Sequence, residues 1–372
     1  MAASHHAAEE GWTGRRLAYL SLETPRPGQA SDTHVREIIA GLRRLGWRVE
    51  LFATRAGGAS AGGGYLTRVA DYARVEAALA HRLRDFDVLY ARAHFAAAPI
   101  ARLARARGLK VVHEINGAPG EIGVTYPFLR PFAGAIAGLY RVQFAAADRL
   151  FPVVEGLGEW ARGFAGHDRV TVVPNGVDAD LFSPDGPVHA PGYRYVAFVG
   201  GLAAWHGVGV MLAALDDPAW PKDVRLVVAG DGPERRLLDA ARDPRLVRLG
   251  RVPQEETPAL LRGAIAALCP IENPAGRSGY GVAPLKLYEA MGCGAPVIAS
   301  DLPHQADLVR GLGAGLVTPP GDAGALARAV ARLAADPDAA RAMGRTGAAH
   351  VVREASWTAR ARMIDAALRG EP

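Results

Sequence analysis

Cysteine is scarce in this sequence of 372 residues: only Cys269 and Cys293 are present. Two cysteines provide neither a disulfide framework nor the spacing of a zinc site, and they suit a reducing compartment. The first 14 residues lack the apolar core of a signal peptide. No stretch reaches the roughly 20 apolar residues of a membrane-spanning helix, because the best approach, residues 131–147, contains Arg141. We therefore expect a cytoplasmic protein, with peripheral contact at the inner face of a membrane as a further option.

Lysine is also rare: of the 43 basic residues, only Lys110, Lys222 and Lys286 are lysine. The formal net charge is nevertheless +5, which suits an anionic ligand or an acidic membrane surface. No basic run interleaves with aromatic residues, so the sequence does not predict nucleic acid binding. A Gly-x-Gly-x-x-Gly motif after the first strand, with an acidic residue about 20 positions later, is missing too, which argues against a nicotinamide dehydrogenase.

What the sequence does contain is a regular alternation of apolar strands and amphipathic helices. Residues 16–22 and 47–52 are typical of strands, and apolar residues at helical spacing over 35–42 predict a helix between them. Strand, helix and strand with short connections form a parallel βαβ unit. The alternation continues over about the first 180 residues, with short late strands expected at 153–154 and 170–173.

A segment rich in proline and glycine, 183–193, is typical of a linker. A second series of strands and helices follows it, and the chain is long enough for two domains with separate cores. We therefore predict an α/β protein with two Rossmann-like, doubly wound parallel-sheet domains, covering residues 15–182 and 194–355. Such sheets bind ligands beyond the carboxyl ends of their strands, so we expect the site in an interdomain cleft.

Residues 279–300 read as a loop, a helix, a tight turn and a buried strand. Pro284 suits the first turn of the helix, where its missing N–H costs nothing. The free N–H groups of that turn, with the helix dipole, form an anion site. Lys286 and Glu289 are three residues apart and share one helix face. Phosphate for the N–H groups and the lysine, and a sugar diol for the carboxylate, would satisfy this arrangement, which indicates a nucleotide-sugar site.

This stretch resembles the C-terminal nucleotide-binding segment of glycosyltransferase family 4, which usually reads Glu, seven residues, Glu, Ala-Met, a small turn and Pro-Val. Glu289, Ala290 and Met291 match its second half, and the resemblance implies that Glu289 grips the ribose of the donor. Gly281 stands where the family usually has its first glutamate, which touches the transferred sugar. Pro-Leu-Lys before the last glutamate, here ending at Lys286, also occurs in the family. The resemblance covers nearly the whole chain.

The turn at Gly200 and Gly201 follows a strand and precedes a helix, and the resemblance extends to it. Family members usually carry Gly-Arg-Leu, three residues and Lys-Gly here, and the Arg and Lys hold the donor diphosphate. This chain has Gly201 and His206 at those two positions. His206, Lys286 and Arg277 are the nearest candidates to compensate for the missing charges.

Two further loops are implied to border the donor. The Gly-x-Gly-Pro turn that begins at Gly230 reads first as a structural element, with its loop edging the donor pocket. Arg251 and Val252 lie in a loop whose backbone usually meets the nucleobase in the family. Taken together, the resemblance implies a set of donor-binding residues: Gly200, Gly201, Gly230, Arg251, Val252, Arg277, Tyr280, Gly281, Val282, Lys286 and Glu289.

On the acceptor side, His-Glu-Ile-Asn at 113–116 ends a strand, where functional residues concentrate in such folds. Many family members carry a histidine that touches the transferred sugar, and Asn116 corresponds to it. Glu114 either binds donor or acceptor hydroxyls or caps a turn. The residues that we expect to act in catalysis are Lys286, His206, Glu114 and Asn116. The acceptor is expected to approach the first loop, at Gly28, Gln29 and Asp32.

Three other features receive structural interpretations. Asp178-Ala179-Asp180 looks like an Asp-x-Asp metal motif, but its Pro-Asn-Gly-Val-Asp setting is a family 4 element, so we interpret it as a capped turn and expect no metal. His304 follows a strand and is expected to be exposed and solvated. Residues 126–144 mix aromatic residues with arginine and predict a helix partly buried against the sheet, with a surface helix that touches lipid as the alternative.

The resemblance implies a GT-B fold in which residues 356–372 form a closing helix that crosses back to the N-terminal domain. It implies a retaining, metal-independent transfer of a hexose from a nucleotide diphosphate sugar to a hydroxyl of a polysaccharide, a glycolipid or a small natural product. A UDP-sugar is the favoured donor, and no cofactor is expected. Because Gly201 and Gly281 replace two functional side chains, a non-catalytic nucleotide-sugar-binding partner protein stays open, as does a sugar-nucleotide epimerase.

Overall fold

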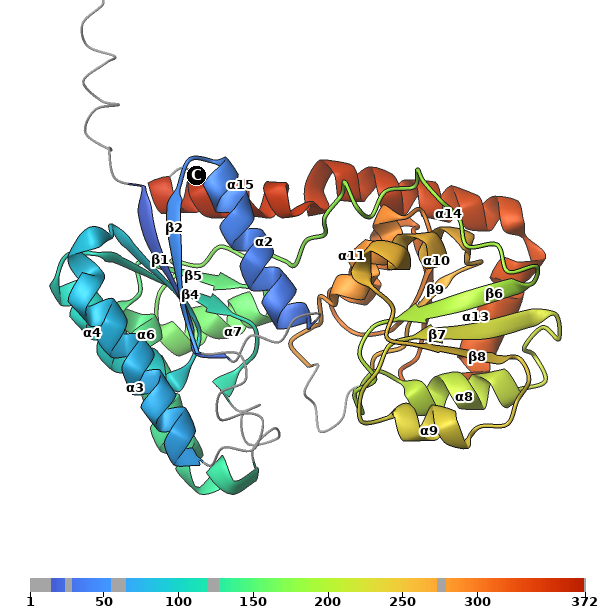
Figure 1. The fold of residues 1–372 in the computed structure, drawn as a ribbon, viewed down its shortest axis with the longest axis horizontal. Coiled ribbons are helices and arrows are strands. Elements are labelled where there is room, and N and C mark those ends of the chain that lie inside the picture. The colour runs from blue at the N-terminus through green and yellow to red at the C-terminus, as the bar shows by residue number, and fades with distance from the viewer. Residues whose placement is uncertain (1–14, 24–28, 55–64, 120–126, 273–278, 371–372) are drawn as a thin grey trace, which may run out of the picture. The chain divides into compact units, whose positions relative to one another are not determined.

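The computed structural model describes residues 15–23, 29–54, 65–119, 127–272 and 279–370. Contacts divide the chain, shown in Figure 1, into two compact units. The first comprises residues 1–173 and 361–372, and the second comprises residues 174–360. The division therefore lies ahead of the linker expected at 183–193.

The first unit contains a five-stranded sheet in the order β2-β1-β3-β4-β5, with all neighbours parallel. Its strands are β1 (Arg16–Ser21), β2 (Arg48–Ala53), β3 (Val88–Arg92), β4 (Lys110–Ile115) and β5 (Arg149–Pro152). Every residue of β3 is buried, as expected of parallel strands that are covered on both faces. Because β1 lies between β2 and β3, the strand order changes direction at β1.

Helices pack against both faces of this sheet (Figure 1). They are α2 (Ala30–Arg44), α3 (Tyr65–Arg82), α4 (Ala98–Ala106), α6 (Ala133–Ala146) and α7 (Glu155–Ala165). One apolar core joins Leu79 and Ile100 of α3 and α4 to Leu89 of β3. A second joins Phe144 of α6 to Ile115 of β4. The helix α15 (Trp357–Arg369) ends in this unit.

The second unit contains a six-stranded sheet in the order β11-β10-β9-β6-β7-β8, again parallel throughout. Its strands are β6 (Arg194–Val199), β7 (Val224–Ala229), β8 (Leu246–Gly250), β9 (Ala267–Cys269), β10 (Val297–Ser300) and β11 (Gly315–Thr318). The order changes direction at β6, which lies between β7 and β9.

The helices of the second unit are α8 (Val208–Asp216), α9 (Arg235–Ala240), α10 (Thr257–Gly263), α11 (Leu285–Gly292), α12 (Gln305–Leu312), α13 (Ala323–Ala335) and α14 (Pro337–His350). They alternate with its strands up to β11, after which α13 and α14 follow one another. The main apolar core of this unit links Phe198 of β6 to Met211 of α8 and Val330 of α13, and a smaller one contains Tyr195 and Val227. The prediction of two parallel-sheet α/β domains is confirmed.

Two details of the strand prediction are wrong. Strand β5 ends at Pro152, so residues 153–154 are not a strand. Residues 170–173 form only an isolated bridge, between Val170 and Leu150. Backbone hydrogen bonds from Thr171 N to Leu150 O (2.9 Å) and from Val173 N to Pro152 O (2.9 Å) still hold this segment along β5. The apolar residues of this segment are explained by its position beside β5. The next residue, Pro174, has no N–H and cannot extend the hydrogen bonding.

The predicted helix near residues 126–144 is α6, preceded by a 3₁₀ turn at Pro127–Phe132. It buries Ile136, Tyr140, Gln143 and Phe144 against the unit, so the prediction of a partly buried helix is confirmed. Among the described residues, none of the helices combines the length and the apolar character that crossing a bilayer requires.

Candidate functional site

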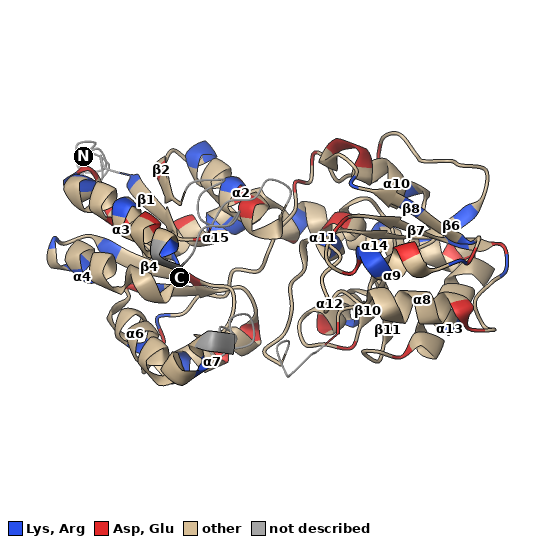
Figure 2. Cartoon of the chain, turned by 60° about the horizontal axis from the view of Figure 1, so that its bottom comes forward, with Lys and Arg blue, Asp and Glu red and all other residues tan. Residues whose placement is uncertain are grey.

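Basic and acidic residues are interspersed along the helices of both units (Figure 2). Exposed ion pairs of this kind contribute little to stability or recognition on their own. Burying a charged group costs free energy, so buried charges are better indicators of a functional site than exposed ones. Two such groups bear on a site: the ammonium of Lys286 in the second unit and the carboxylate of Glu114 in the first.

Lys286 lies in the first turn of α11, and its ammonium group is buried. Its Nζ is 4.1 Å from the centroid of the Phe198 ring at the end of β6, a cation–π contact. Within the described part of the chain Nζ has no hydrogen-bond partner. Burial lowers the pKa of Lys286 to about 8, against the opposing charges of Cys269 and Glu289. A buried ammonium that no described residue hydrogen-bonds suits an anionic ligand.

Glu289 lies one helical turn beyond Lys286, on the same side of α11, as the spacing predicts. Its carboxylate makes no hydrogen bond to the described residues. Burial raises the pKa of Glu289 to about 7, and the charge of Lys286 works against that rise. The helix thus carries an ammonium and a carboxylate whose charges interact, and neither group forms a hydrogen bond with a described residue.

The loop before α11 has a conformation that requires glycine. Gly281 has a φ of 104°, which side-chain-bearing residues rarely adopt, and a Cβ there would lie 3.1 Å from the Pro303 carbonyl oxygen. A glutamate at this position would therefore be strained. The N–H of Val282 donates to Pro303 O (3.1 Å), so it is not available to a phosphate. Pro284 was expected in the first turn of the helix. It is instead the N-cap residue, which precedes that turn.

The turn after β6 brings Gly200 against Lys286. A Cβ on Gly200 would lie 3.1 Å from Lys286 Cε, and the φ of Gly200 is 142°. At the next residue, the Gly201 carbonyl oxygen lies 2.5 Å from His206 Nδ1. Because a carbonyl oxygen only accepts, Nδ1 carries the proton. His206 can therefore donate to a phosphate through Nε2 only as an imidazolium.

Gly230 packs directly against this turn. A Cβ on Gly230 would lie 1.9 Å from Gly200 O, and Gly230 N donates to Gly250 O at 2.7 Å. Glycine is thus needed for the close approach of three strand ends, which supports the structural interpretation. Arg251 and Val252 follow β8 at the same edge of the sheet.

The expectation that His304 is exposed and solvated is wrong, because its side chain is half-buried. Its Nε2 lies 2.7 Å from Tyr288 Oη of α11, and burial lowers the pKa of His304 to about 4, with Arg360 adding to the effect. Its φ of 68° is the one positive value among the non-glycine residues that the structure describes. Such strain persists only where surrounding contacts enforce it. His304 N donates to Asp307 Oδ2 (3.1 Å), a contact that helps to fix the start of α12.

In the first unit, Glu114 ends β4 and is only 2% exposed. Protein groups surround both carboxylate oxygens at 2.5–3.1 Å: Tyr19 Oη, Tyr90 Oη, Arg92 Nη1, Asn116 Nδ2 and His34 Nε2. Burial would raise the pKa of Glu114, but the charges of His34 and Arg92 and the hydrogen bonds lower it well below its usual range. The expectation that Glu114 meets substrate hydroxyls or caps a turn does not fit this geometry.

Sequence reasoning missed the partners of Glu114. Arg92 is paired in register with Glu114 across β3 and β4, and its Nε also lies 3.1 Å from Glu23 Oε1. His34 comes from α2. The available signal was position, because Glu23 and Arg92 stand at or just after the carboxyl ends of strands.

The other predicted residues lie at the start of α2 and in the loop before α11. Gln29 is the N-cap of α2, without a side-chain cap, and Asp32 pairs with Arg36 one turn later. Tyr280 is 37% exposed. Gly28 and Arg277 lie outside the described residues.

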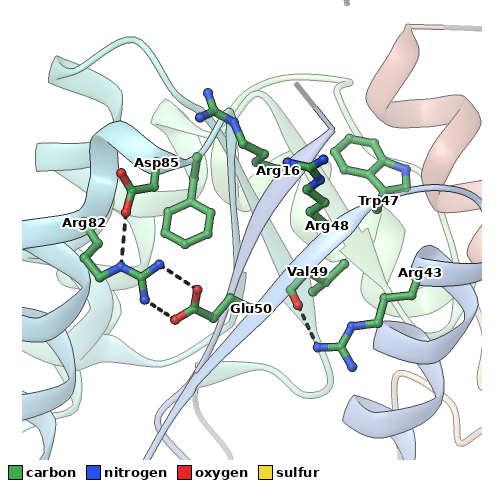
Figure 3. Close-up of a pocket in the computed structure, with 9 residues that line it drawn as sticks. Arg16, Arg43, Trp47, Arg48, Val49, Glu50, Arg82 and Asp85 are labelled. Carbon is green, nitrogen blue, oxygen red and sulfur yellow. Dashed lines mark hydrogen bonds and ion pairs between the residues drawn. The ribbon is translucent and has the colours of Figure 1, made fainter. Parts of the chain in front are cut away.

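A groove of about 410 Å³ lies at the amino ends of β1 and β2 (Figure 3). Its lining includes Arg16, Arg43, Trp47, Arg48, Val49, Glu50, Arg82, Asp85 and Phe86. Arg82 pairs there with Glu50 and Asp85, and Arg43 donates to Val49 O at 2.7 Å. Parallel α/β sheets bind ligands at the opposite, carboxyl edge, so we do not place the site here.

The described residues include no group of three or more His, Cys, Asp or Glu side chains that could hold a metal ion. Asp178 Oδ1 accepts hydrogen bonds from Asp180 N (3.0 Å) and Leu181 N (3.2 Å). The Asp-x-Asp segment is therefore the capped turn that was predicted.

Two parallel-sheet α/β units, with a buried cation and a carboxylate at the carboxyl edge of the second, define a protein of the GT-B class. Solved structures share this fold. Sucrose-phosphate synthase from Thermosynechococcus elongatus matches with a TM-score of 0.76 and 19% identity, over 95% of this chain and 98% of that one. Anabaena Alr3699/HepE in complex with UDP and glucose matches with a TM-score of 0.69 and 17% identity, over 95% and 99%.

The chain belongs to glycosyltransferase family 4. Residues 31–181 match the model described as Glycosyltransferase Family 4, and residues 193–336 match that of Glycosyl transferases group 1. The phosphatidyl-myo-inositol mannosyltransferase of Mycobacterium leprae is 30% identical over 295 residues, which cover 75% of this chain and 72% of that protein.

Other curated relatives match over shorter segments. The D-inositol 3-phosphate glycosyltransferase of Segniliparus rotundus is 31% identical over 219 residues, 54% of this chain and 48% of that protein. The 2-deoxystreptamine glucosyltransferase of Streptomyces kanamyceticus is 30% identical over 194 residues, 45% and 46% of the two chains. The chain thus spans about half the length of these two relatives.

Proposed function

We propose that this protein is a glycosyltransferase that moves a hexose from a nucleotide diphosphate sugar to a hydroxyl of an acceptor. The observation that carries the proposal is the buried ammonium of Lys286, which has no described hydrogen-bond partner, one helical turn from the carboxylate of Glu289. A nucleoside diphosphate offers both groups what they lack, a phosphate for the cation and a ribose diol for the carboxylate. Family membership supports the same reaction class.

Glu289 holds the two ribose hydroxyls in this proposal. Hydrogen bonds to a charged acceptor contribute about 1.5–3 kcal/mol. A uridine nucleotide is the favoured donor, and the GT-B neighbour Alr3699/HepE, which was solved with UDP and glucose, supports that choice. Arg251 and Val252 border the base through their loop.

The diphosphate lies over the turn at Gly200 and Gly201, beside Lys286. The ammonium stabilises the charge that builds on the phosphate as the sugar–phosphate bond breaks, which is preorganised electrostatic catalysis. His206 assists in its protonated form, because Nδ1 is engaged by the Gly201 carbonyl. Resemblance to the family supports retention of the anomeric configuration, a front-side displacement without a protein nucleophile, and independence of metal ions and cofactors.

The acceptor hydroxyl belongs to a glycan, a lipid or a small molecule. Relatives named for D-inositol 3-phosphate and for 2-deoxystreptamine support a sugar-like or cyclitol acceptor. Peripheral contact with a membrane is a further proposal, supported by the exposed apolar side chains of Phe132, Leu139 and Val142 in and beside α6.

Calorimetric titration of UDP, GDP and dTDP, without metal, tests the donor site. We expect one diphosphate to bind the wild type, and Glu289→Ala to bind it at least tenfold more weakly, since a factor of ten corresponds to about 1.4 kcal/mol. Binding that the substitution leaves unchanged would remove Glu289 from the site. Hydrolysis or transfer of the matching sugar donor by the purified chain then separates an enzyme from a non-catalytic binding protein.

A further inference from the structure

The carboxyl edge of the first unit's sheet carries a second group of polar side chains. Glu23 follows β1, His94 follows β3 and Asn116 follows β4. Strand order changes direction at β1, and parallel α/β sheets bind ligands at such points. Arg92 and Glu114, which connect Glu23 to Asn116, are buried. A ligand at this edge would therefore meet Glu23, His94 and Asn116.

The orientation of Asn116 is set by Glu114. Asn116 Nδ2 lies 2.6 Å from Glu114 Oε1. An ionised carboxylate only accepts hydrogen bonds, so the amide nitrogen faces Glu114 and Oδ1 points away from it. Since Asn116 is exposed, it presents a hydrogen-bond acceptor to a ligand. Glu114 is thus a positioning residue for Asn116.

The charge of Arg92 is already balanced. Its Nη1 lies 2.5 Å from Glu114 Oε1 and its Nε lies 3.1 Å from Glu23 Oε1, so two carboxylates face one guanidinium. His34 Nε2, the other basic group here, lies 3.0 Å from Glu114 Oε2. In the second unit, by contrast, Lys286 has no hydrogen-bonded carboxylate. Of these described groups, only Lys286 offers an unbalanced cation to a phosphate.

His94 is a neutral hydrogen-bond donor. Its Nδ1 accepts from Ala96 N at 3.2 Å. Burial lowers the pKa of His94 to about 4, although the charge of Glu23 opposes this. The uncharged ring therefore carries its proton on Nε2. Together with Glu23 and Asn116, it offers two acceptors and one uncharged donor.

We propose that the acceptor ring bound at this edge carries hydroxyl or ammonium groups and no phosphate, with Glu23 and Asn116 accepting hydrogen bonds from it. This rests on the proposed glycosyltransferase function and adds the class of acceptor. A phosphate would meet the carboxylate of Glu23, which is 45% exposed, and the carbonyl oxygen of Asn116. Hydroxyl and ammonium groups donate to both.

Three cyclitols with the same ring size test the proposal: myo-inositol, 2-deoxystreptamine and D-inositol 3-phosphate. Transfer is measured as release of the nucleoside diphosphate that binds in calorimetry, from its glucose donor. We expect kcat/KM for myo-inositol or 2-deoxystreptamine to exceed that for D-inositol 3-phosphate at least tenfold. The neutral and the cationic cyclitol separate hydroxyl from ammonium recognition. An equal or better rate with D-inositol 3-phosphate overturns the proposal.

Glu23→Gln tests the residue that sets the selectivity. It removes one of the two carboxylates that face Arg92, so the kcat/KM ratio of 2-deoxystreptamine to D-inositol 3-phosphate should fall at least tenfold. Asp87→Asn is the matched control, because Asp87 pairs with Arg16 (3.0 Å) at the amino edge of the same sheet. If both variants shift the ratio equally, the selectivity comes from overall charge and the proposal fails.

Failure of this inference is distinguishable from failure of the proposed function. If the nucleoside diphosphate binds and its sugar donor is hydrolysed, but none of the three cyclitols is glycosylated, the assignment of the acceptor class is wrong and the donor site stands. If no nucleoside diphosphate binds, the proposed function itself is wrong.

Discussion

Lys286 Nζ lies 4.1 Å from the centroid of the Phe198 ring, and no described residue forms a hydrogen bond with it. A ring face offsets only part of the cost of removing an ammonium from water. The pKa of Lys286, lowered to about 8, reports that cost. The buried carboxylate of Glu114 in the first unit differs from Lys286, because protein donors surround it. The described residues therefore leave the ammonium of Lys286 without a hydrogen bond, whereas they surround the carboxylate of Glu114 with donors.

Lys286→Met should weaken UDP binding at least tenfold while leaving uridine binding unchanged, because methionine keeps an unbranched stem of similar size and removes the charge that meets the diphosphate. The variant should also melt at a higher temperature than the wild type, since a buried, unbalanced cation is lost. Calorimetry with both ligands and thermal unfolding measure the two effects.

Lys222→Met is the control for Lys286→Met, because Lys222 is exposed, and it should change neither quantity. Equal losses of uridine and UDP affinity in Lys286→Met would contradict a phosphate role for this lysine.

The affinity for UDP should be highest between about pH 7 and pH 8. A bound diphosphate favours charged Lys286, whose pKa in the free protein is about 8, so above that pH binding requires uptake of a proton and weakens. A bound ribose favours charged Glu289, whose pKa is about 7, so below that pH binding requires release of a proton and weakens. Calorimetry across pH 5.5–9.5 measures both limbs.

Each limb of the pH profile has its own variant. Lys286→Met should abolish the alkaline limb only, and Glu289→Gln the acid limb only. Uridine is the better probe of the acid limb, because a terminal phosphate itself titrates near pH 6. Alkaline weakening that persists in Lys286→Met would assign that limb to another group.

The two glycines that stand in place of family side chains should respond differently to replacement. Gly201→Arg should be tolerated and should tighten UDP binding about tenfold or more, because the nearest atom to a Cβ there is His206 Cε1 at 3.9 Å and an arginine–phosphate bond contributes about 1.5–3 kcal/mol. Gly281→Glu should lower the melting temperature and gain no activity, since its φ is 104°. Thermal unfolding and UDP titration of both variants check this. A stable, more active Gly281→Glu protein would refute it.

Glu114→Gln should destabilise the protein by about 3–5 kcal/mol at neutral pH, the usual cost of removing one partner from a buried ion pair. The folded state lowers the pKa of Glu114. Its stabilising effect is therefore present above the unfolded pKa of about 4.3 and is lost as the pH falls below it. The difference between wild type and variant should shrink between pH 6 and pH 3 in urea unfolding.

Glu155→Gln is the control for Glu114→Gln. Glu155 also pairs with an arginine, Arg162 at 2.8 Å, but is 61% exposed, and such pairs contribute about 0–1 kcal/mol. A difference at Glu114 that stays constant down to pH 3 would mean that its charge is not what stabilises the fold.

The fold could be predicted from the sequence because parallel strands covered on both faces leave a local mark. Runs such as residues 88–92 and 224–229 are almost entirely apolar. Between such runs lie segments whose apolar residues recur at helical spacing. The order of the strands could not be predicted, because pairing depends on contacts between distant segments. Residues 170–173 show the limit of the pattern: they run along β5 by hydrogen bonds without forming a regular strand.

Only part of the candidate site, too, could be predicted from the sequence. Lys286 and Glu289 could be predicted because their relation is local, three residues on one helix. The surroundings of Glu114 could not be, because its partners Tyr19, His34 and Arg92 come from three separate elements, and only the folded sheet brings them together. The burial of His304 could not be predicted either, because Tyr288 and Arg360, which lie against it, come from other helices.

Because lysine is scarce in this sequence, Lys286 can be observed by lysine-specific isotope labelling. Isotope labelling of lysine alone would yield three side-chain amine signals for the whole chain. Lys222 is exposed and Lys110 donates to Leu368 O at 2.9 Å, so these two provide internal references. The third signal would report the protonation of a single buried amine, and its movement on addition of a nucleotide would be a direct spectroscopic record of ligand arrival.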